Sequence, residues 1–123
     1  MSRPSASGAL LDEQGRVVCE HCEDATRTLT RMRGLMGRRS LEPSHGMLIR
    51  RTGSIHTFFM RFPIDAVFLD RKMRVKKIVR ELARNRAAAS LGARNVLELP
   101  AGEARRVGLE PGSLLTWRPP GEG

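Results

Sequence analysis

The chain has 123 residues, of which 40% are hydrophobic, and 22 basic against 13 acidic side chains give a formal net charge of +9. This length suits one domain with its own core, which needs no disulfide to fold. No apolar run approaches the roughly 20 residues that span a bilayer, and no apolar segment of a signal peptide follows the polar N-terminus. We therefore expect a cytoplasmic protein with no membrane segment and with reduced thiols at Cys19 and Cys22.

The positive charge comes almost entirely from arginine. Only Lys72, Lys76 and Lys77 are lysines, so nineteen of the basic residues are arginines. A strongly positive net charge is typical of proteins that bind nucleic acids. However, abundant Arg, Ala and Gly with scarce Lys and absent Tyr is also typical of GC-rich codon usage. Nucleic acid is therefore an open alternative as a partner and is not the favoured one.

The first half of the chain predicts four strands and one helix. The expected elements are a hairpin over residues 10–19 around the turn Asp12–Gly15, a helix over 25–33 capped by Asp24, a strand over 46–49 and an alternating strand over 54–60 that ends before Pro63. In the alternating strand, His56 shares a face with Phe58 and Met60. We therefore expect His56 to be half-buried between large apolar side chains, in a strand covered on both sides.

The second half predicts a further hairpin, two strands and a short helix. The hairpin consists of strands 66–69 and 73–79 around the turn Asp70–Lys72, and the broken alternation at residues 77–79 indicates a bulge or a change in burial. It is followed by an irregular loop over 84–94, a strand over 96–99, a helix over 101–107 ended by Gly108, and a strand over 114–117. Residues 1–8 and 119–123 are expected to be disordered, which leaves residues 9–118 as a single domain. Many short strands and few helices predict a mainly β fold, sandwich-like or barrel-like.

Two segments carry a family resemblance, namely Arg33–Arg38 and Ile55–Asp65. They are followed by Val67–Asp70, Leu97–Leu99, Ala101–Gly102 and Gly108–Gly112. In this order and spacing, residues 10–117 resemble the bacterial and archaeal "domain of unknown function" family 192 (DUF192). The resemblance implies a mainly β fold and no established biochemical activity. Many relatives carry an export signal, and the Cys19/Cys22 pair is not part of the resemblance.

Eight residues on or near these segments are the candidate ligand-binding residues. They are Arg33, Met36, Arg38, His56, Met60, Arg61, Asp65 and Glu98. We expect a pocket where the strand that contains His56 meets the Arg33–Arg38 loop. The glycines of the loop allow a ligand to approach the backbone closely, and the arginine side chains can bind a carboxylate or a phosphate through two parallel hydrogen bonds. The sequence therefore favours a binding module for a small anionic ligand or a peptide.

Each candidate also has a structural explanation. The ring of His56 can bond to a backbone carbonyl, and Asp65 can cap the turn after Pro63 or pair with Arg61 or Arg38. Glu98 lies between two leucines, so its carboxylate must point to solvent or, if buried, be satisfied by an arginine or by several hydrogen-bond donors. The arginines of the 33–38 loop can simply be solvated.

Three other functional classes stay open. An enzyme would use His56 as general acid or base, with Asp65 or Glu98 orienting it, but no clear nucleophile is present. A non-specific nucleic-acid binder would use the basic surface, in particular Arg71 to Arg86, although aromatic platforms for bases are scarce. A scaffold would bind no small ligand. The sequence does not decide whether the protein is an enzyme, and it does not give the oligomeric state.

Cys19 and Cys22 have the C-x-x-C spacing of zinc and redox sites. A structural zinc site needs four ligands, and no second pair exists, so His45, His56 or a second subunit would have to complete it. A redox pair would normally lie in an alternating β/α pattern, which is absent. We therefore expect no metal and no cofactor, and exposed thiols whose replacement by serine leaves the stability unchanged.

Overall fold

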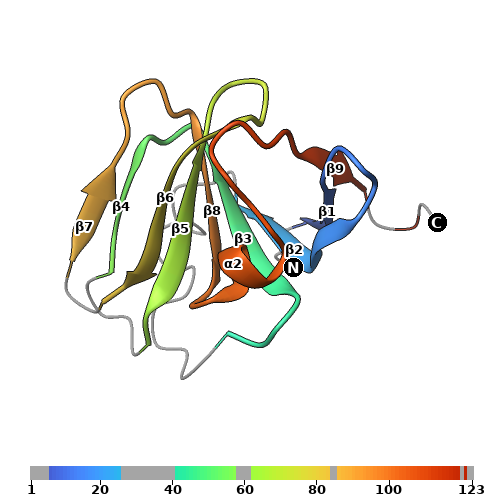
Figure 1. The fold of residues 1–123 in the computed structure, drawn as a ribbon, viewed down its shortest axis with the longest axis horizontal. Helices are drawn as coiled ribbons and strands as arrows, with labels where there is room; N and C mark the ends of the chain where they lie inside the picture. The colour runs from blue at the N-terminus through green and yellow to red at the C-terminus, as the bar shows by residue number, and fades with distance from the viewer. Residues whose placement is uncertain (1–5, 26–40, 58–61, 84–85, 120, 122–123) are drawn as a thin grey trace, which may run out of the picture.

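The computed structural model describes residues 6–25, 41–57, 62–83, 86–119 and 121. In these residues the fold is mainly β (Figure 1) and forms a single small domain, as predicted. The elements are β1 (Ala6–Leu11), β2 (Val17–Ala25), β3 (His45–Arg50), β4 (Ser54–His56), β5 (Ile64–Leu69), β6 (Val75–Leu82), β7 (Ala87–Ala89), β8 (Asn95–Pro100), α2 (Glu103–Arg106) and β9 (Thr116–Arg118). No helix among the described residues is long and apolar enough to cross a membrane.

Seven of the strands form one sheet in the order β6-β5-β8-β3-β2-β1-β9. Only β2 and β3 run parallel, and every other neighbouring pair is antiparallel. The two edges of the sheet are connected through the residues before β9, because Val75 N donates to Ser113 O at 2.7 Å and Leu115 N donates to Met73 O at 3.0 Å. The strands β4 and β7 form a separate antiparallel pair (Figure 1).

Each face of the large sheet carries a hydrophobic core. The first core contains Leu10, Val18, Cys19, Cys22, Leu48, Val67, Leu69, Val75, Leu97, Leu99, Ala104, Leu109 and Leu115. The second core contains Leu41, Met47, Ile49, Ile64, Ala66, Phe68, Leu82, Ala93 and Val96, and Ile55 of β4 and Ala88 of β7 pack against it. Because strand side chains alternate between faces, β5 supplies residues to both cores and is buried along its whole length. The arrangement is therefore sandwich-like, with one short helix among the described residues.

Local turn chemistry explains the two predicted hairpins. Asp12 Oδ1 accepts hydrogen bonds from Gln14 N and Arg16 N, both at 2.9 Å, in the turn between β1 and β2. Asp70 Oδ1 does the same for Lys72 N at 2.8 Å and Arg74 N at 3.0 Å between β5 and β6. The predicted bulge in β6 is confirmed, because the pairing shifts between Phe68–Lys77 and Leu69–Val75. Both hairpins therefore lie where the sequence placed them.

Four local predictions differ from the structure. Asp24 lies within β2 and not at a helix N-terminus, because its carboxylate accepts from Arg50 Nε of the adjacent β3, at 2.9 Å to each oxygen. The strand predicted over 54–60 ends at His56. A strand, β7, forms inside the expected loop 84–94 because it pairs with β4. Finally, β1 begins at Ala6, within the segment expected to be disordered. Apart from residue 25, the predicted helix lies outside the described residues.

Candidate functional site

The predicted site residues divide into two groups. Arg33, Met36, Arg38, Met60 and Arg61 lie outside the described residues. The remaining three, His56, Asp65 and Glu98, do not converge. Asp65 is paired across the sheet with Leu99 of the first core, whereas Glu98 is paired with Met47 and Ala66 of the second core. Their carboxylates therefore leave opposite faces of the sheet, and no single site contains both.

His56 is exposed, so the prediction of a half-buried histidine is wrong. It ends β4, where Ile55 is the side chain packed on the second core, so alternation turns His56 away from that core. The buried polar residue here is its neighbour Thr57, whose Oγ1 donates to Ala83 O at 2.6 Å and accepts from Arg86 N at 2.8 Å. His56 therefore lies on the surface of the β4–β7 pair and lines no described pocket.

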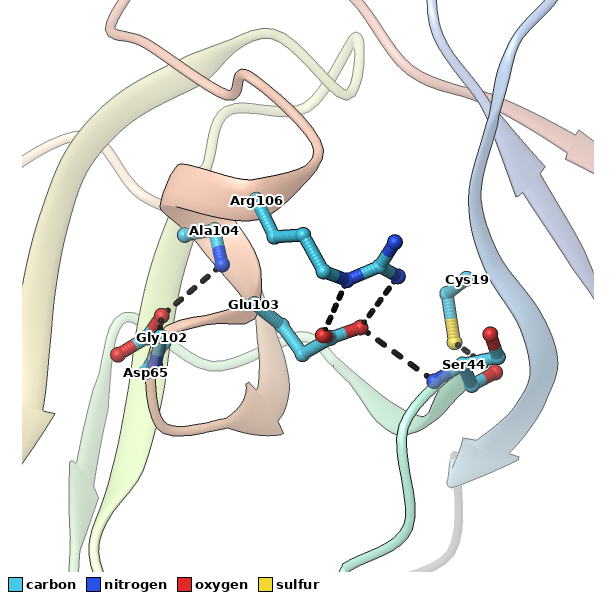
Figure 2. Close-up of polar contacts among 7 residues, drawn as sticks. All are labelled: Cys19, Ser44, Asp65, Gly102, Glu103, Ala104 and Arg106. Carbon is cyan, nitrogen blue, oxygen red and sulfur yellow. Dashed lines mark hydrogen bonds and ion pairs between the residues drawn. The ribbon is translucent and has the colours of Figure 1, made fainter.

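Asp65 is completely buried and accepts hydrogen bonds from backbone N–H groups of two other segments, of which Figure 2 shows the start of α2. Its Oδ1 accepts from Glu81 N of β6 at 2.8 Å, and its Oδ2 accepts from Gly102 N at 3.1 Å and from Ala104 N at 2.9 Å. The carboxylate therefore caps the start of α2 from a distant strand, and does not cap the turn after Pro63. The sequence shows that Asp65 is a carboxylate within a segment of apolar residues, which indicates this role. The sequence does not show which N–H groups bind the carboxylate.

A second carboxylate ties α2 to the β2–β3 region (Figure 2). Glu103 accepts from Arg106 Nε at 2.5 Å and from a terminal nitrogen of that guanidinium at 2.8 Å, and it also accepts from Ser44 N at 3.3 Å. The hydrogen bond from Arg106 holds the pKa of Glu103 below its ordinary value. Ser44 O in turn accepts from the Cys19 thiol at 3.6 Å. These charged groups satisfy one another, so we assign them a structural role.

Cys19 and Cys22 are free thiols buried in the first core, so the prediction of exposed thiols is wrong. A hydrogen bond with Cys19, together with burial, raises the pKa of the Cys22 thiol, which favours inert thiols over reactive ones. His45 cannot complete a zinc site with them. Its neighbour Gly46 faces the pair, since a Cβ there would lie 2.9 Å from Cys19 Sγ, so His45 points to the other face. No described group of three or more His, Cys, Asp and Glu residues could hold a metal ion.

Replacing both cysteines by serine is expected to destabilise the protein. Each substitution places a hydroxyl group in an apolar core, at a cost of about 1–3 kcal/mol when the group finds no full set of partners. Urea unfolding of Cys19→Ser/Cys22→Ser against the parent chain measures the loss. An unchanged unfolding midpoint would show that the thiols contribute nothing to the packing of the first core.

The described residues also form a pocket of about 480 Å³ that the sequence did not predict. It lies where the β3–β4, β5–β6 and β7–β8 connections meet, at the upper edge of the sheet in Figure 1. Its walls are Arg50, Arg51, Thr52, Gly53, Arg71, Ala93, Arg94 and Asn95. Half of these residues are arginines and none is acidic, so the pocket is strongly cationic. We refer to it as the arginine pocket.

Backbone hydrogen bonds fix the three connections that form the arginine pocket. Thr52 N donates to Arg94 O at 3.0 Å, and Arg94 N donates to Leu69 O at 2.7 Å. Asn95 Nδ2 also donates to Asp70 O, at 3.1 Å. Gly53 allows the close approach of the β3–β4 and β7–β8 connections, because a Cβ there would lie 2.8 Å from Ala93 O. The arginine side chains therefore extend from connections that hydrogen bonds hold in place.

The four arginines are not equivalent. Arg50 is neutralised by Asp24, and its Cζ also lies 5.8 Å from the ring centroid of Trp117. Arg51, Arg71 and Arg94 are exposed, and no described residue makes a hydrogen bond or an ion pair to their side chains. These three arginines lie in three different connections and belong to no sequence motif. The sequence pointed to Arg71 only as part of a basic segment, and the grouping of the three arginines was missed because only the fold brings them together.

Fold and site together define a small, mainly β, single-domain protein with a cationic pocket at one end of its sheet. The chain belongs to the DUF192 family, described as "Uncharacterized ACR", whose model matches residues 9–117. It is 32% identical to a UPF0127 protein of Thermococcus gammatolerans over 112 residues, which cover 86% of this chain and 72% of that protein. It is 31% identical to a UPF0127 protein of Thermococcus kodakarensis over 97 residues, which cover 74% of this chain and 60% of that protein.

Two solved structures share the fold. One is a protein of Sinorhizobium meliloti described as a "putative transcription regulator", with 27% identity, a TM-score of 0.80, and coverage of 94% of this chain and 98% of that one. The other is a protein of unknown function from Novosphingobium aromaticivorans, with 23% identity, a TM-score of 0.78 and coverage of 94% of both chains. The family name carries no activity, so function has to be inferred from the site.

Proposed function

We propose that this protein is a binding module for a small anionic ligand, which it holds in the arginine pocket. The observation that supports the proposal is the placement of three guanidinium groups, those of Arg51, Arg71 and Arg94, around one pocket without an acidic partner among the described residues. Like charges gathered in this way repel one another, and a bound anion would relieve the repulsion. Guanidinium groups donate paired hydrogen bonds to carboxylate and phosphate oxygens, whether these belong to a free molecule or to an acidic peptide.

The same features favour a small ligand over a nucleic acid. A volume of about 480 Å³ is in the usual range of ligand pockets. None of the residues that line the pocket is aromatic, so no base could stack there, and stacking is the usual source of affinity for single strands. The Sinorhizobium meliloti relative is described as a "putative transcription regulator", so nucleic acid is the alternative ligand. A binding experiment has to distinguish nucleic acid from a small anion.

A second anion site at the Arg33–Arg38 loop stays a proposal from the sequence. The glycines and arginines of that loop support it. Since His56, Asp65 and Glu98 do not converge, they add no common site to it. The arginine pocket therefore carries the functional proposal.

Removing two of its arginines is expected to weaken anion binding at least tenfold. In Arg71→Ala/Arg94→Ala the pocket loses two exposed guanidiniums, and because charge-assisted hydrogen bonds contribute about 1.5–3 kcal/mol each, the affinity should fall while the fold stays intact. Isothermal titration calorimetry with inorganic phosphate, pyrophosphate and citrate measures the affinity.

The matched control is Arg105→Ala, which removes an exposed arginine of α2 outside the pocket. It should leave binding unchanged at constant ionic strength. Equal losses in both variants would point to the net charge of the chain and against a pocket. Tight, sequence-selective binding of an oligonucleotide, lost in the pocket variant, would replace the small ligand by nucleic acid.

A further inference from the structure

The turn between β7 and β8 presents a leucine to the solvent. Ala93 N donates to Ser90 O at 3.2 Å, which closes a turn with Leu91 at its second position and Gly92 at its third. Gly92 has a φ of 81°, which the third position of a type II turn requires and which glycine adopts without strain. Leu91 is 97% exposed, more than any other large apolar residue in the described part of the chain, so it contributes to neither core.

This turn is attached to a wall of the arginine pocket. Ser90 N donates to Gly53 O at 3.0 Å, and both Gly53 and Ala93 line the pocket. Figure 1 shows the β7–β8 connection rising beyond the upper ends of the strands, together with the β5–β6 connection that contains Arg71. Leu91 and the guanidinium groups of the pocket therefore lie at the same end of the molecule.

Basic side chains lie beside the turn and in the connections around it. A Cβ at Gly92 would lie 3.0 Å from Lys76 Nζ, and Lys77 Nζ donates to the last carbonyl of β7 at 3.0 Å. The single acid of the three connections that form the pocket is Asp70, and it accepts hydrogen bonds from the backbone of its own turn. This end of the molecule therefore combines an exposed apolar tip with positively charged surroundings.

We infer that this end of the molecule docks on a lipid bilayer with acidic headgroups. Lipid phosphates bind at the arginine pocket, and Leu91 enters the boundary between the headgroups and the acyl chains. The inference rests on the proposed function, because it names the phosphate of a lipid as the anion in the arginine pocket. Electrostatic attraction to anionic lipids and the burial of an apolar side chain are the two contributions that hold a protein on a membrane without spanning it.

A bilayer suits this surface better than a protein partner does. Leu91 lies at the tip of a turn, so a protein that covered it would have to offer a matching hollow. The same protein would also have to place acidic side chains opposite the arginines of the pocket. An anionic bilayer meets both requirements without a fixed shape, since its headgroups are mobile and an apolar side chain can enter between them.

The experiment separates the bilayer from the free anion. Co-sedimentation of the full chain with vesicles of phosphatidylcholine, alone or mixed with phosphatidylglycerol, measures membrane binding, and calorimetry with glycerol 3-phosphate measures binding of the free anion. We expect binding to the mixed vesicles only. Leu91→Ser should weaken it roughly tenfold, because the apolar contact with the bilayer is lost, and should leave the affinity for glycerol 3-phosphate and the urea midpoint unchanged. Arg71→Ala/Arg94→Ala should weaken both kinds of binding.

Val17→Thr is the matched control for Leu91→Ser. It replaces the other exposed large apolar residue of the described chain, at the start of β2 and outside the arginine pocket. This variant should bind the mixed vesicles like the parent chain, and so should Arg105→Ala at constant ionic strength.

Three results would overturn the inference. If the parent chain binds glycerol 3-phosphate but not the mixed vesicles, the proposed function stands with a free anion as the ligand, and Leu91 is left for a protein partner or for none. Equal vesicle binding by Leu91→Ser and the parent chain would mean that no side chain enters the bilayer. Equal losses in Arg105→Ala and the pocket variant would reduce the attraction to net charge. Vesicle binding that needs Leu91 and both arginines, without binding of glycerol 3-phosphate, would refute a free ligand and support the bilayer.

Discussion

Replacement of Asp65 by alanine is expected to destabilise the protein by about 3 kcal/mol or more. The substitution removes a completely buried carboxylate that accepts from three backbone N–H groups, those of Glu81, Gly102 and Ala104, of which the last is buried as well. Each unsatisfied buried donor costs roughly 1–3 kcal/mol. The loss should appear in urea unfolding as a lower midpoint with an unchanged slope, which is the signature of a change in stability alone.

Asp12 offers the matched control for Asp65. Its carboxylate also accepts two backbone N–H bonds and pairs with Arg16, but in a turn at the surface and not between strands of the sheet. Asp12→Ala should therefore cost roughly 1 kcal/mol or less. Asp65→Asn should fall between the two alanine variants, because the amide keeps one acceptor oxygen and places a donor against the remaining N–H groups. If Asp65→Ala unfolds at the same urea concentration as Asp12→Ala, α2 does not depend on the carboxylate.

Glu98 is expected to give the protein a stability that falls as the pH rises. Because the folded protein raises the pKa of this carboxyl from 4.5 to about 7, the folded state binds a proton in a window where the unfolded state has lost it. The contribution of Glu98 is thus fully present below about pH 4.5 and is lost as the pH rises through about 7. A shift of this size corresponds to about 3 kcal/mol.

Two variants isolate this contribution. Glu98→Gln cannot ionise, so its unfolding free energy should lack the part of the pH dependence that Glu98 supplies between about pH 4.5 and pH 7. Glu98→Leu should be more stable than the parent chain at about pH 8, because an apolar side chain suits the second core better than a buried, ionised carboxylate. The measurement is urea unfolding of all three proteins at several pH values. Parallel pH profiles for the parent chain and Glu98→Gln would contradict the assignment.

The sequence predicted those elements whose causes are local. The hairpins at 10–19 and 66–79 depend on alternating side chains and on the turn residues Asp12 and Asp70, and both were confirmed. The strand β7 was missed because three alanines carry no strand signal of their own, and only the pairing with β4 orders them. Asp24 was misassigned because an aspartate before a run of residues can be a helix N-cap or a strand residue that pairs with a base on the adjacent strand. In the structure it pairs with Arg50 of β3.

The site was harder to predict than the fold. Alternation indicated that His56 and Phe58 share a face, but it cannot tell which face of an isolated strand is covered, and His56 proved to be exposed. The same pattern correctly identified Glu98 as a carboxylate in conflict with its surroundings. The arginine pocket could not be predicted, since Arg51, Arg71 and Arg94 come together only after the sheet is formed.

The strand β8 has one further consequence. Asn95, at its beginning, lines the arginine pocket, and Glu98 lies three residues further on. An odd separation places these two side chains on opposite faces of the sheet. The arginine pocket therefore lies where β8 begins, and Glu98 lies roughly 10 Å further along the strand, facing the second core. A charge bound in the pocket and the charge of Glu98 should therefore have nearly additive effects on the stability.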